Sequence, residues 1–356
     1  MGAKITVGTT WTESFLHEVN RLNNEIGSDH HIAIDEFYGS FPCDPMGTAR
    51  SASRLPKNEK ILFADYIRKC HDAKISFAYT NNSICTGGSK HLDDSIPIFT
   101  KHCEHLCNSG VDSIILSMPV FMEIVRKEFP QLKLIASTIC NIDSIIMAGY
   151  YRDMGVARIV LPVDANRNYH LLESLVNEFC DIDFEVLMTD VCMYECPYRQ
   201  HHFALQSHDS LEYIGELANR AIQNYPFDRC WGHLRKQWPA EILKSRWIRP
   251  EDIRTYENIG INHFKISGRT MPEVLILKSI SAFLSRTYDG SLWDILAIIP
   301  GDSNAEGVCD WKVPNILLNG FVDYFIDNGQ FCKERCGVSC CYCDQYAERI
   351  RKELHG

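Results

Sequence analysis

The 356-residue chain is 45% hydrophobic and 23% charged, as an ordinary globular protein is, and it is long enough for one large α/β barrel or for two domains. Its net charge of −10 argues against broad binding to nucleic-acid backbones, because proteins that bind phosphates usually carry a basic excess. No apolar run is long enough to predict a membrane span or a secretory signal. Sixteen cysteines without such a signal indicate a reducing cytoplasm, where thiols bind metals or stay buried.

Short β-branched or aliphatic runs recur along the chain, and most are followed by a segment with helical periodicity. We expect strands at Ile5–Gly8, Ile32–Phe37, Ile75–Thr80, Ser113–Ser117, Leu132–Ser137, Ala157–Leu161, Phe184–Thr189 and His263–Ser267. Eight such units are the count of a TIM-type (β/α)8 barrel, which is the fold class that the sequence predicts. A doubly wound open sheet is the alternative, but no glycine-rich phosphate turn follows the first strand.

The regular spacing of the units stops after the seventh strand. An insertion over residues 191–262 carries three cysteines, and Thr270–Arg286 is predicted as the helix that closes the barrel. The last 25 residues hold five more cysteines. We therefore expect a barrel over residues 1–290, which includes the insertion, and a C-terminal extension with a cysteine cluster over residues 291–356.

Polar residues follow the predicted strands, and in a TIM barrel functional residues gather at the C-terminal ends of strands. Carboxylates and histidines at such ends can move protons. The candidate catalytic residues are Asp190, Glu36 and His202. Guanidinium groups match carboxylates in a bidentate way, and an amide can orient a ligand. The candidate substrate-binding residues are Arg50, Asn141 and Arg269.

The cysteines of the insertion form the first candidate metal group. Cys192 and Cys196 follow the seventh strand, and Cys230 lies further along the chain. Soft thiolates select iron–sulfur clusters or zinc, and three nearby histidines keep a mixed cysteine–histidine zinc site open. A four-iron cluster normally takes four protein ligands, so the fourth would be Cys43, Cys180 or none.

The tail cysteines form the second candidate metal group. Short spacings favour ligation, because several thiolates must converge within a few ångströms. The four expected ligands are Cys332, Cys336, Cys340 and Cys343, with Cys341 facing away. Part of this group fits the CxxxCxxC pattern of radical S-adenosylmethionine enzymes, but that motif precedes its barrel, whereas here only 13 residues follow Cys343. An iron–sulfur cluster is expected, with zinc as the alternative.

Several segments together resemble the U32 "peptidase" family and its relatives. They are Cys192–His202 (CMYECPYRQHH), Leu243–Arg269, Ser137–Asp164 and Glu36–Ser40, and the resemblance covers most of residues 1–286. It implies a barrel that holds a [4Fe–4S] cluster on Cys192, Cys196 and Cys230. Some relatives act in the oxygen-independent hydroxylation of ubiquinone or RNA, and others were first described as collagenases. The cysteine tail departs from those hydroxylases.

The leading functional expectation is an iron–sulfur enzyme that performs redox or oxygen-independent hydroxylation chemistry on a small molecule, or on a modified peptide or RNA. Two [4Fe–4S] clusters are expected, with zinc as the alternative in the tail, in a cytoplasmic protein that uses an electron donor or a partner subunit. One alternative is a U32-type peptidase, although the chain has no HExxH or GxSxG motif. The other is a non-catalytic iron–sulfur partner subunit.

Overall fold

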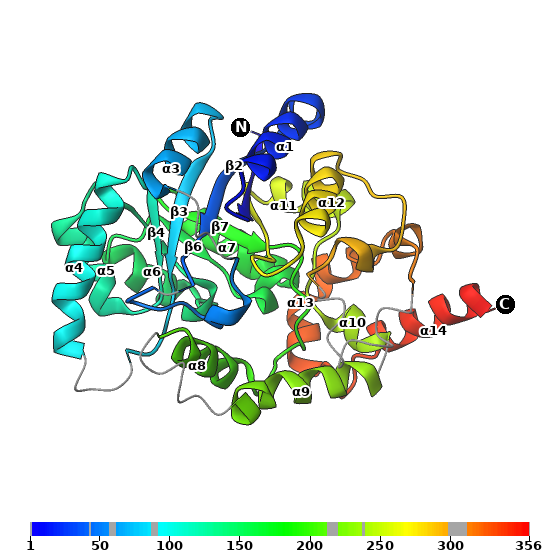
Figure 1. Cartoon of the computed structure of the whole chain (residues 1–356). Helices are drawn as coiled ribbons and strands as arrows, with labels where there is room; N and C mark the ends of the chain where they lie inside the picture. The colour runs from blue at the N-terminus through cyan, green and yellow to red at the C-terminus, as the bar shows by residue number, and fades with distance from the viewer. Residues whose placement is uncertain are drawn as a thin grey trace.

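A computed structural model describes residues 2–42, 44–56, 62–86, 92–211, 220–236, 239–297 and 312–355. Eight parallel strands close into one barrel in sequence order, with helices outside it (Figure 1). The strands are β1 Ala3–Gly8, β2 Ile32–Gly39, β3 Ser76–Asn81, β4 Ser113–Leu116, β5 Lys133–Ala136, β6 Arg158–Val160, β7 Asp183–Leu187 and β8 His263–Ile266. The predicted TIM-type barrel and its eight strands are confirmed, and the open-sheet alternative is wrong.

Side chains of the strands alternate between the barrel interior and the surrounding helices, because the strand period is two. The outward-facing residues join the main hydrophobic core under the helices, as Ile5, Val7, Phe264 and Ile266 do. A smaller apolar cluster fills the upper interior and is composed of Tyr38, Ala78, Ile115, Ile135, Val160, Val163 and Leu187. The interior is therefore packed, and any cavity must lie above this cluster.

A buried ionic layer occupies the barrel interior on the same strands. Its members are Thr6, Glu36, Arg158, Glu185 and Lys265, all at most 7% exposed. The Nη1 atom of Arg158 lies 2.6 Å from Oε1 of Glu36, and Thr6 Oγ1 donates to Glu185 Oε1 at 2.5 Å. Burial raises the pKa of Glu185, but the charges of Lys265 and Arg158 outweigh burial and hold that pKa below its usual value. The layer is thus charged and internally neutralised.

The helices outside the barrel are amphipathic and several have side-chain caps. They include α1 Glu13–Leu22, α3 Phe63–Asp72, α4 Leu92–Asn108, α5 Pro119–Glu128, α6 Ile145–Asp153, α7 Tyr169–Glu178, α11 Ile253–Asn258 and α12 Glu273–Leu284. The side chains of Thr12, Ser144 and Asn168 accept backbone N–H bonds at the starts of α1, α6 and α7. Among the described residues, no helix has the length and apolarity needed to cross a bilayer.

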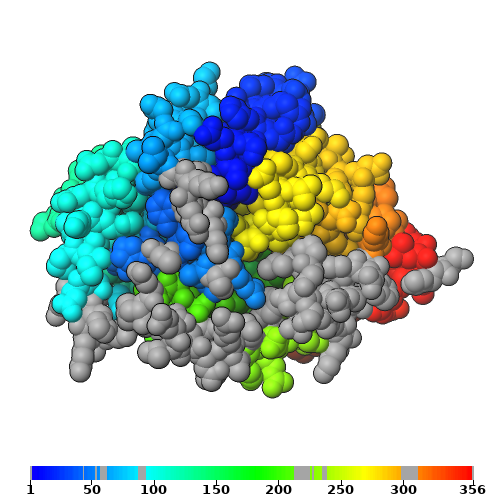
Figure 2. Space-filling view, in the orientation of Figure 1, coloured from blue at the N-terminus to red at the C-terminus, as the bar shows by residue number. Residues whose placement is uncertain are grey.

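The insertion and the C-terminal extension form a layer beside the barrel mouth (Figure 1). The insertion contains α8 Arg199–Asp209, α9 Arg220–Lys236 and α10 Ala240–Lys244, and the extension contains α13 Asp323–Arg335 and α14 Tyr342–His355. Helix α13 packs on α7, and α14 packs on α10. In the space-filling view, α14 (red) lies at one edge of the molecule, next to orange and yellow segments (Figure 2). The tail cysteines are therefore anchored on the insertion and on the barrel.

Candidate active site at the mouth of the barrel

A cavity of about 250 Å³ lies at the C-terminal ends of the strands. The interior cluster residues Tyr38, Ile115, Val160 and Leu187 line it from the barrel side. Helices α8 and α9 of the insertion cover it with His202, Phe203, Cys230 and Trp231. The expected location of function, at the strand ends, therefore coincides with an enclosed cavity.

Asp190 is the only carboxylate among the described residues that line this cavity. It follows β7, and the hydroxyl of Ser267, just past β8, donates to its Oδ2 atom at 2.8 Å. The parallel barrel brings these two strand ends side by side, since β7 pairs with β8. Asp190 thus lies where the sequence predicted a catalytic acid–base group, held by a neighbour that the sequence did not indicate.

Cations outnumber carboxylates in the cavity wall, which contains Arg50, Arg54, Arg199, Lys265 and Arg269. Arg269 donates to the hydroxyls of Ser40 and Thr48 at 3.0 and 3.1 Å, and its burial lowers its pKa to about 10. Lys265 Nζ lies 4.0 Å from the centre of the Tyr38 ring and 3.5 Å from Glu185. Such an excess of positive charge in a walled cavity favours an anionic ligand.

His202 enters the cavity from α8, as a candidate catalytic residue. Burial, together with the positive charges of Arg50 and Arg54, lowers the pKa of His202 to about 4. The imidazole is consequently neutral near pH 7. As a neutral group it can accept a hydrogen bond or a proton, and its predicted catalytic role stays a prediction.

The cysteines of the insertion, Cys192, Cys196 and Cys230, which the sequence predicted as metal ligands, line the same cavity. Burial raises the pKa of Cys192 to about 11 and that of Cys230 to about 12, so both thiols are protonated near neutral pH. Among the described residues, no three His, Cys, Asp or Glu side chains are arranged to hold a metal ion. Cys43 lies outside the described residues, and Cys180 is exposed. In their described arrangement, these thiols do not fit a four-thiolate cluster.

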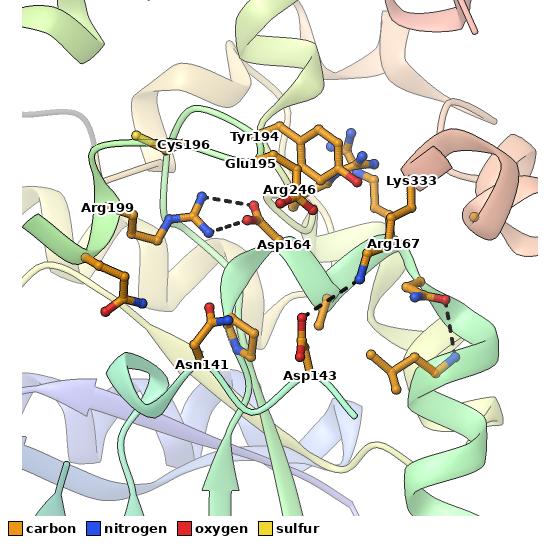
Figure 3. A pocket seen from close by; sticks show the side chains of 16 residues that line it. Asn141, Asp143, Asp164, Arg167, Tyr194, Glu195, Cys196, Arg199, Arg246 and Lys333 are labelled. Atoms are coloured by element: carbon orange, nitrogen blue, oxygen red, sulfur yellow. Dashed lines mark hydrogen bonds and ion pairs between the residues drawn. The ribbon is translucent and has the colours of Figure 1, made fainter. Parts of the chain in front are cut away.

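Two further site candidates lie away from this cavity. Glu36 is not among its lining residues, because its side chain belongs to the ionic layer and bonds to Arg158. Asn141 lines a second cavity of about 190 Å³, which we call the side pocket (Figure 3). Neither residue joins Asp190, and their predicted roles stay predictions.

The side pocket lies between the barrel mouth and α13 and is rich in charge (Figure 3). Asp164 and Arg199 form a bidentate ion pair, and Arg199 also lines the main cavity. Lys333 of α13 faces Asp143 at 3.8 Å. Arg199 therefore belongs to the wall between the two cavities, and its charge is already paired.

The predicted tail ligands Cys332, Cys336, Cys340 and Cys343 lie at the junction of α13 and α14, and none of them lines either cavity. Lys265 and Ser267 were missed by sequence reasoning, which treated β8 only as a buried strand. Their alternation with Phe264 and Ile266 was the signal that could have placed them in the barrel interior.

The fold and the site define a (β/α)8 barrel with a cationic cavity around one carboxylate, and comparisons with known proteins narrow this class. Residues 46–195 match the model of Peptidase family U32. An uncharacterised protease of Methanocaldococcus jannaschii is 28% identical over 337 residues, which cover 95% of this chain and 94% of the relative. A solved structure described as a U32 peptidase has a TM-score of 0.52 at 17% identity and covers 75% of this chain and 93% of its own. The predicted resemblance to the U32 family is therefore confirmed.

These findings correct the leading functional expectation. The matching family model is described as a peptidase family and the curated relative as a protease, and the described residues contain no ready metal-binding group. The prediction of an iron–sulfur redox enzyme or hydroxylase is therefore wrong. Cysteine spacing reports how close thiols are along the chain, and by itself it does not define the reaction that a protein catalyses.

Proposed function

We propose that this protein is a U32-type peptidase that hydrolyses an amide bond in the cavity at the barrel mouth. The family match and the relative named as a protease support this class of reaction. The single observation that carries it is the lone carboxylate of Asp190 in a cavity whose other charged groups are cations. This pairing provides a base for the attacking group and positive charge for the oxyanion.

We assign the attack to a water molecule, because burial raises the pKa of two of the three cysteines that line the cavity. Cys192 and Cys230 are protonated near neutral pH, and thiols react as thiolates. Asp190, oriented by Ser267, accepts the proton of the water and returns it to the leaving amine. A water-activating carboxylate needs neither the HExxH nor the GxSxG motif, which the sequence lacks.

The cations of the cavity have two tasks in this proposal. Lys265, which faces the cavity from β8, stabilises the negative oxygen that forms when water adds to the carbonyl. Arg50 and Arg269 bind a carboxylate of the substrate, either its C-terminus or an acidic side chain. The substrate class is accordingly a short peptide with a free carboxylate near the cleaved bond.

Cleavage of a defined peptide mixture by the full chain, followed by mass spectrometry, tests this function. We expect Asp190→Asn to lower kcat at least about 100-fold, since general-base catalysis contributes about 10²- to 10⁴-fold. Asp143→Asn, which removes a carboxylate from the side pocket, is the matched control and leaves cleavage unchanged. Cys192→Ser also retains cleavage. A wild-type chain that cleaves none of the peptides, or an Asp190→Asn variant of full activity, would contradict the proposal.

A further inference from the structure

Four thiols and two guanidinium groups meet where the C-terminal extension joins the insertion. The tail cysteines are Cys332 near the end of α13, Cys336 directly after it, and Cys340 and Cys343 at the start of α14. Arg246 Nη2 donates to Cys332 Sγ at 3.3 Å. The carbonyl of Leu243 accepts from Arg167 Nη1 at 2.6 Å and from Cys343 Sγ at 3.9 Å. Thiols of both helices therefore lie beside the same pair of arginines.

A tight turn holds the middle two of these cysteines together. Cys336 and Cys340 form an isolated backbone bridge, and the amide of Gly337 donates to the Cys340 carbonyl at 3.4 Å. Gly337 has a φ of +72°, a conformation that glycine adopts without steric cost. The neighbouring Cys341 is exposed and does not share this environment. The turn thus gathers four of the five tail cysteines and leaves one outside.

Both arginines are buried without a carboxylate partner among the described residues. Arg167 and Arg246 are 1% and 4% exposed, and among the described residues neither forms an ion pair with a carboxylate. Arg167 instead contacts backbone carbonyls and the faces of Trp247, Phe321 and Phe325. The Nε atoms of both arginines have no hydrogen-bond partner in the described structure. An arginine stays charged in a protein, so its burial costs several kcal/mol unless a negative group compensates it.

We propose that the tail cysteines bind one Zn²⁺ ion as a four-thiolate structural centre. Each cysteine binds the metal as a thiolate. Four thiolates around one divalent ion leave two net negative charges, one for each buried guanidinium. Closed sites of four cysteines are typical of structural zinc, and soft thiolates select it over magnesium or calcium.

The described thiols bond to protein groups and do not form a ready-made ligand set. Cys343 faces the Leu243 carbonyl, and Cys340 lies 3.6 Å from the hydroxyl of Tyr324. Zinc binding requires these side chains to rotate off their present partners. The backbone turn already holds Cys336 beside Cys340, so side-chain rotation is the movement that the proposal requires.

The zinc centre would connect the C-terminal extension to the loop around Tyr194, which lines the side pocket. The guanidinium of Arg246 stacks 3.7 Å from the centre of the Tyr194 ring, and Tyr194 lies between Cys192 and Cys196 in sequence. With Cys332 bound to zinc, Arg246 would pair with a thiolate and hold this loop in place. The centre touches neither cavity and takes no part in the proposed hydrolysis.

The metal content of the full chain, purified under reducing conditions from zinc-supplemented medium, tests this inference without any activity assay. Elemental analysis should find about one zinc per chain, as one closed four-cysteine site requires. Cys340→Ser and Cys343→Ser should each remove the bound zinc. Two matched controls, Cys341→Ser in the tail and Cys192→Ser in the insertion, should retain it.

A second measurement covers the case in which the serine variants fail to fold. Co²⁺ added to zinc-depleted wild-type protein should give the intense sulfur-to-metal charge-transfer absorption of a tetrahedral thiolate site, and added Zn²⁺ should abolish it. Wild-type protein without zinc and without this absorption would overturn the proposal. So would zinc that is lost in Cys192→Ser but kept in Cys343→Ser, or a disulfide among the tail cysteines of the reduced preparation.

Discussion

At the scale of single residues, charge is arranged differently inside the barrel and at its mouth. In the ionic layer, Glu36 and Glu185 face Arg158 and Lys265, so carboxylates and cations balance. At the mouth, Arg50 donates to a backbone carbonyl and Arg269 donates to two hydroxyls, and both line the cavity with Asp190. Arg199 and Lys265 also line it, but they pair with carboxylates outside it. The interior pairs therefore stabilise the fold, whereas the mouth retains positive charge for a ligand.

Substitution of Arg158 tests how much the ionic layer contributes to the free energy of unfolding. Arg158→Met leaves Glu36 buried without its cation, and breaking a buried pair on one side costs about 3–5 kcal/mol. Arg152→Met is the matched control, since Arg152 pairs with Asp153 on the surface and such pairs contribute about 0–1 kcal/mol. The free energies of unfolding in urea measure both losses. Equal losses in the two variants would show that the layer does not stabilise the fold.

The neutral state of His202 makes stability depend on pH. Its pKa is lowered from 6.5 to about 4, so between these values the unfolded chain binds a proton that the folded chain does not. The free energy of unfolding therefore falls as the pH decreases through this window, by at most about 3 kcal/mol. His202→Gln should flatten this slope in unfolding experiments at pH 7 and pH 4.5. The exposed His170→Gln should leave it unchanged, and an unaltered slope in His202→Gln would contradict the assignment.

At the scale of elements, the contact between α13 and the barrel depends on a residue without a side chain. Gly329 of α13 lies against the backbone of Arg167, in the short helix Val163–Arg167 that follows β6. A Cβ atom at Gly329 would lie 2.7 Å from the Arg167 carbonyl oxygen, closer than packed atoms approach. Glycine therefore allows the extension to dock beside the arginine that faces the tail cysteines.

Gly329→Ala should accordingly destabilise the protein by about 1–3 kcal/mol, the usual cost of overpacking. Gly232→Ala in α9 is the matched control, because a Cβ atom there meets nothing within 4 Å. That control should be neutral or slightly stabilising, since alanine favours a helix more than glycine does. Thermal unfolding of both variants measures the difference. Similar melting temperatures for the two variants would show that α13 can shift without cost.

At the scale of the whole molecule, the insertion joins the barrel to the C-terminal extension. Trp247 follows α10 and stacks on Phe321 of the extension, with ring centres 5.7 Å apart, and Phe321 in turn contacts Tyr346 of α14 at 4.8 Å. The same insertion covers the cavity with α8 and α9. One segment thus shapes the proposed site of hydrolysis and carries the partners of the proposed zinc centre. A partner subunit and an electron donor stay predictions.

The sequence by itself determined the architecture and the grouping of the cysteines. Strands such as Ser113–Leu116 could be read because their apolar runs are local and buried on both faces. Asp190, Arg269 and His202 could be named because they follow strands or begin the insertion, and the structure brings all three to one cavity. The family could be recognised from motifs that lie within short segments.

Only the tertiary structure decided what these residues face. Glu36 turned out to bond within the ionic layer, Asn141 lines the side pocket, and Ser267 holds Asp190 across two strand ends. The protonation of His202 and of the buried thiols also depends on packing, since burial is the main cause of each shift. These properties arise from contacts between segments far apart in the chain, which periodicity and spacing do not encode.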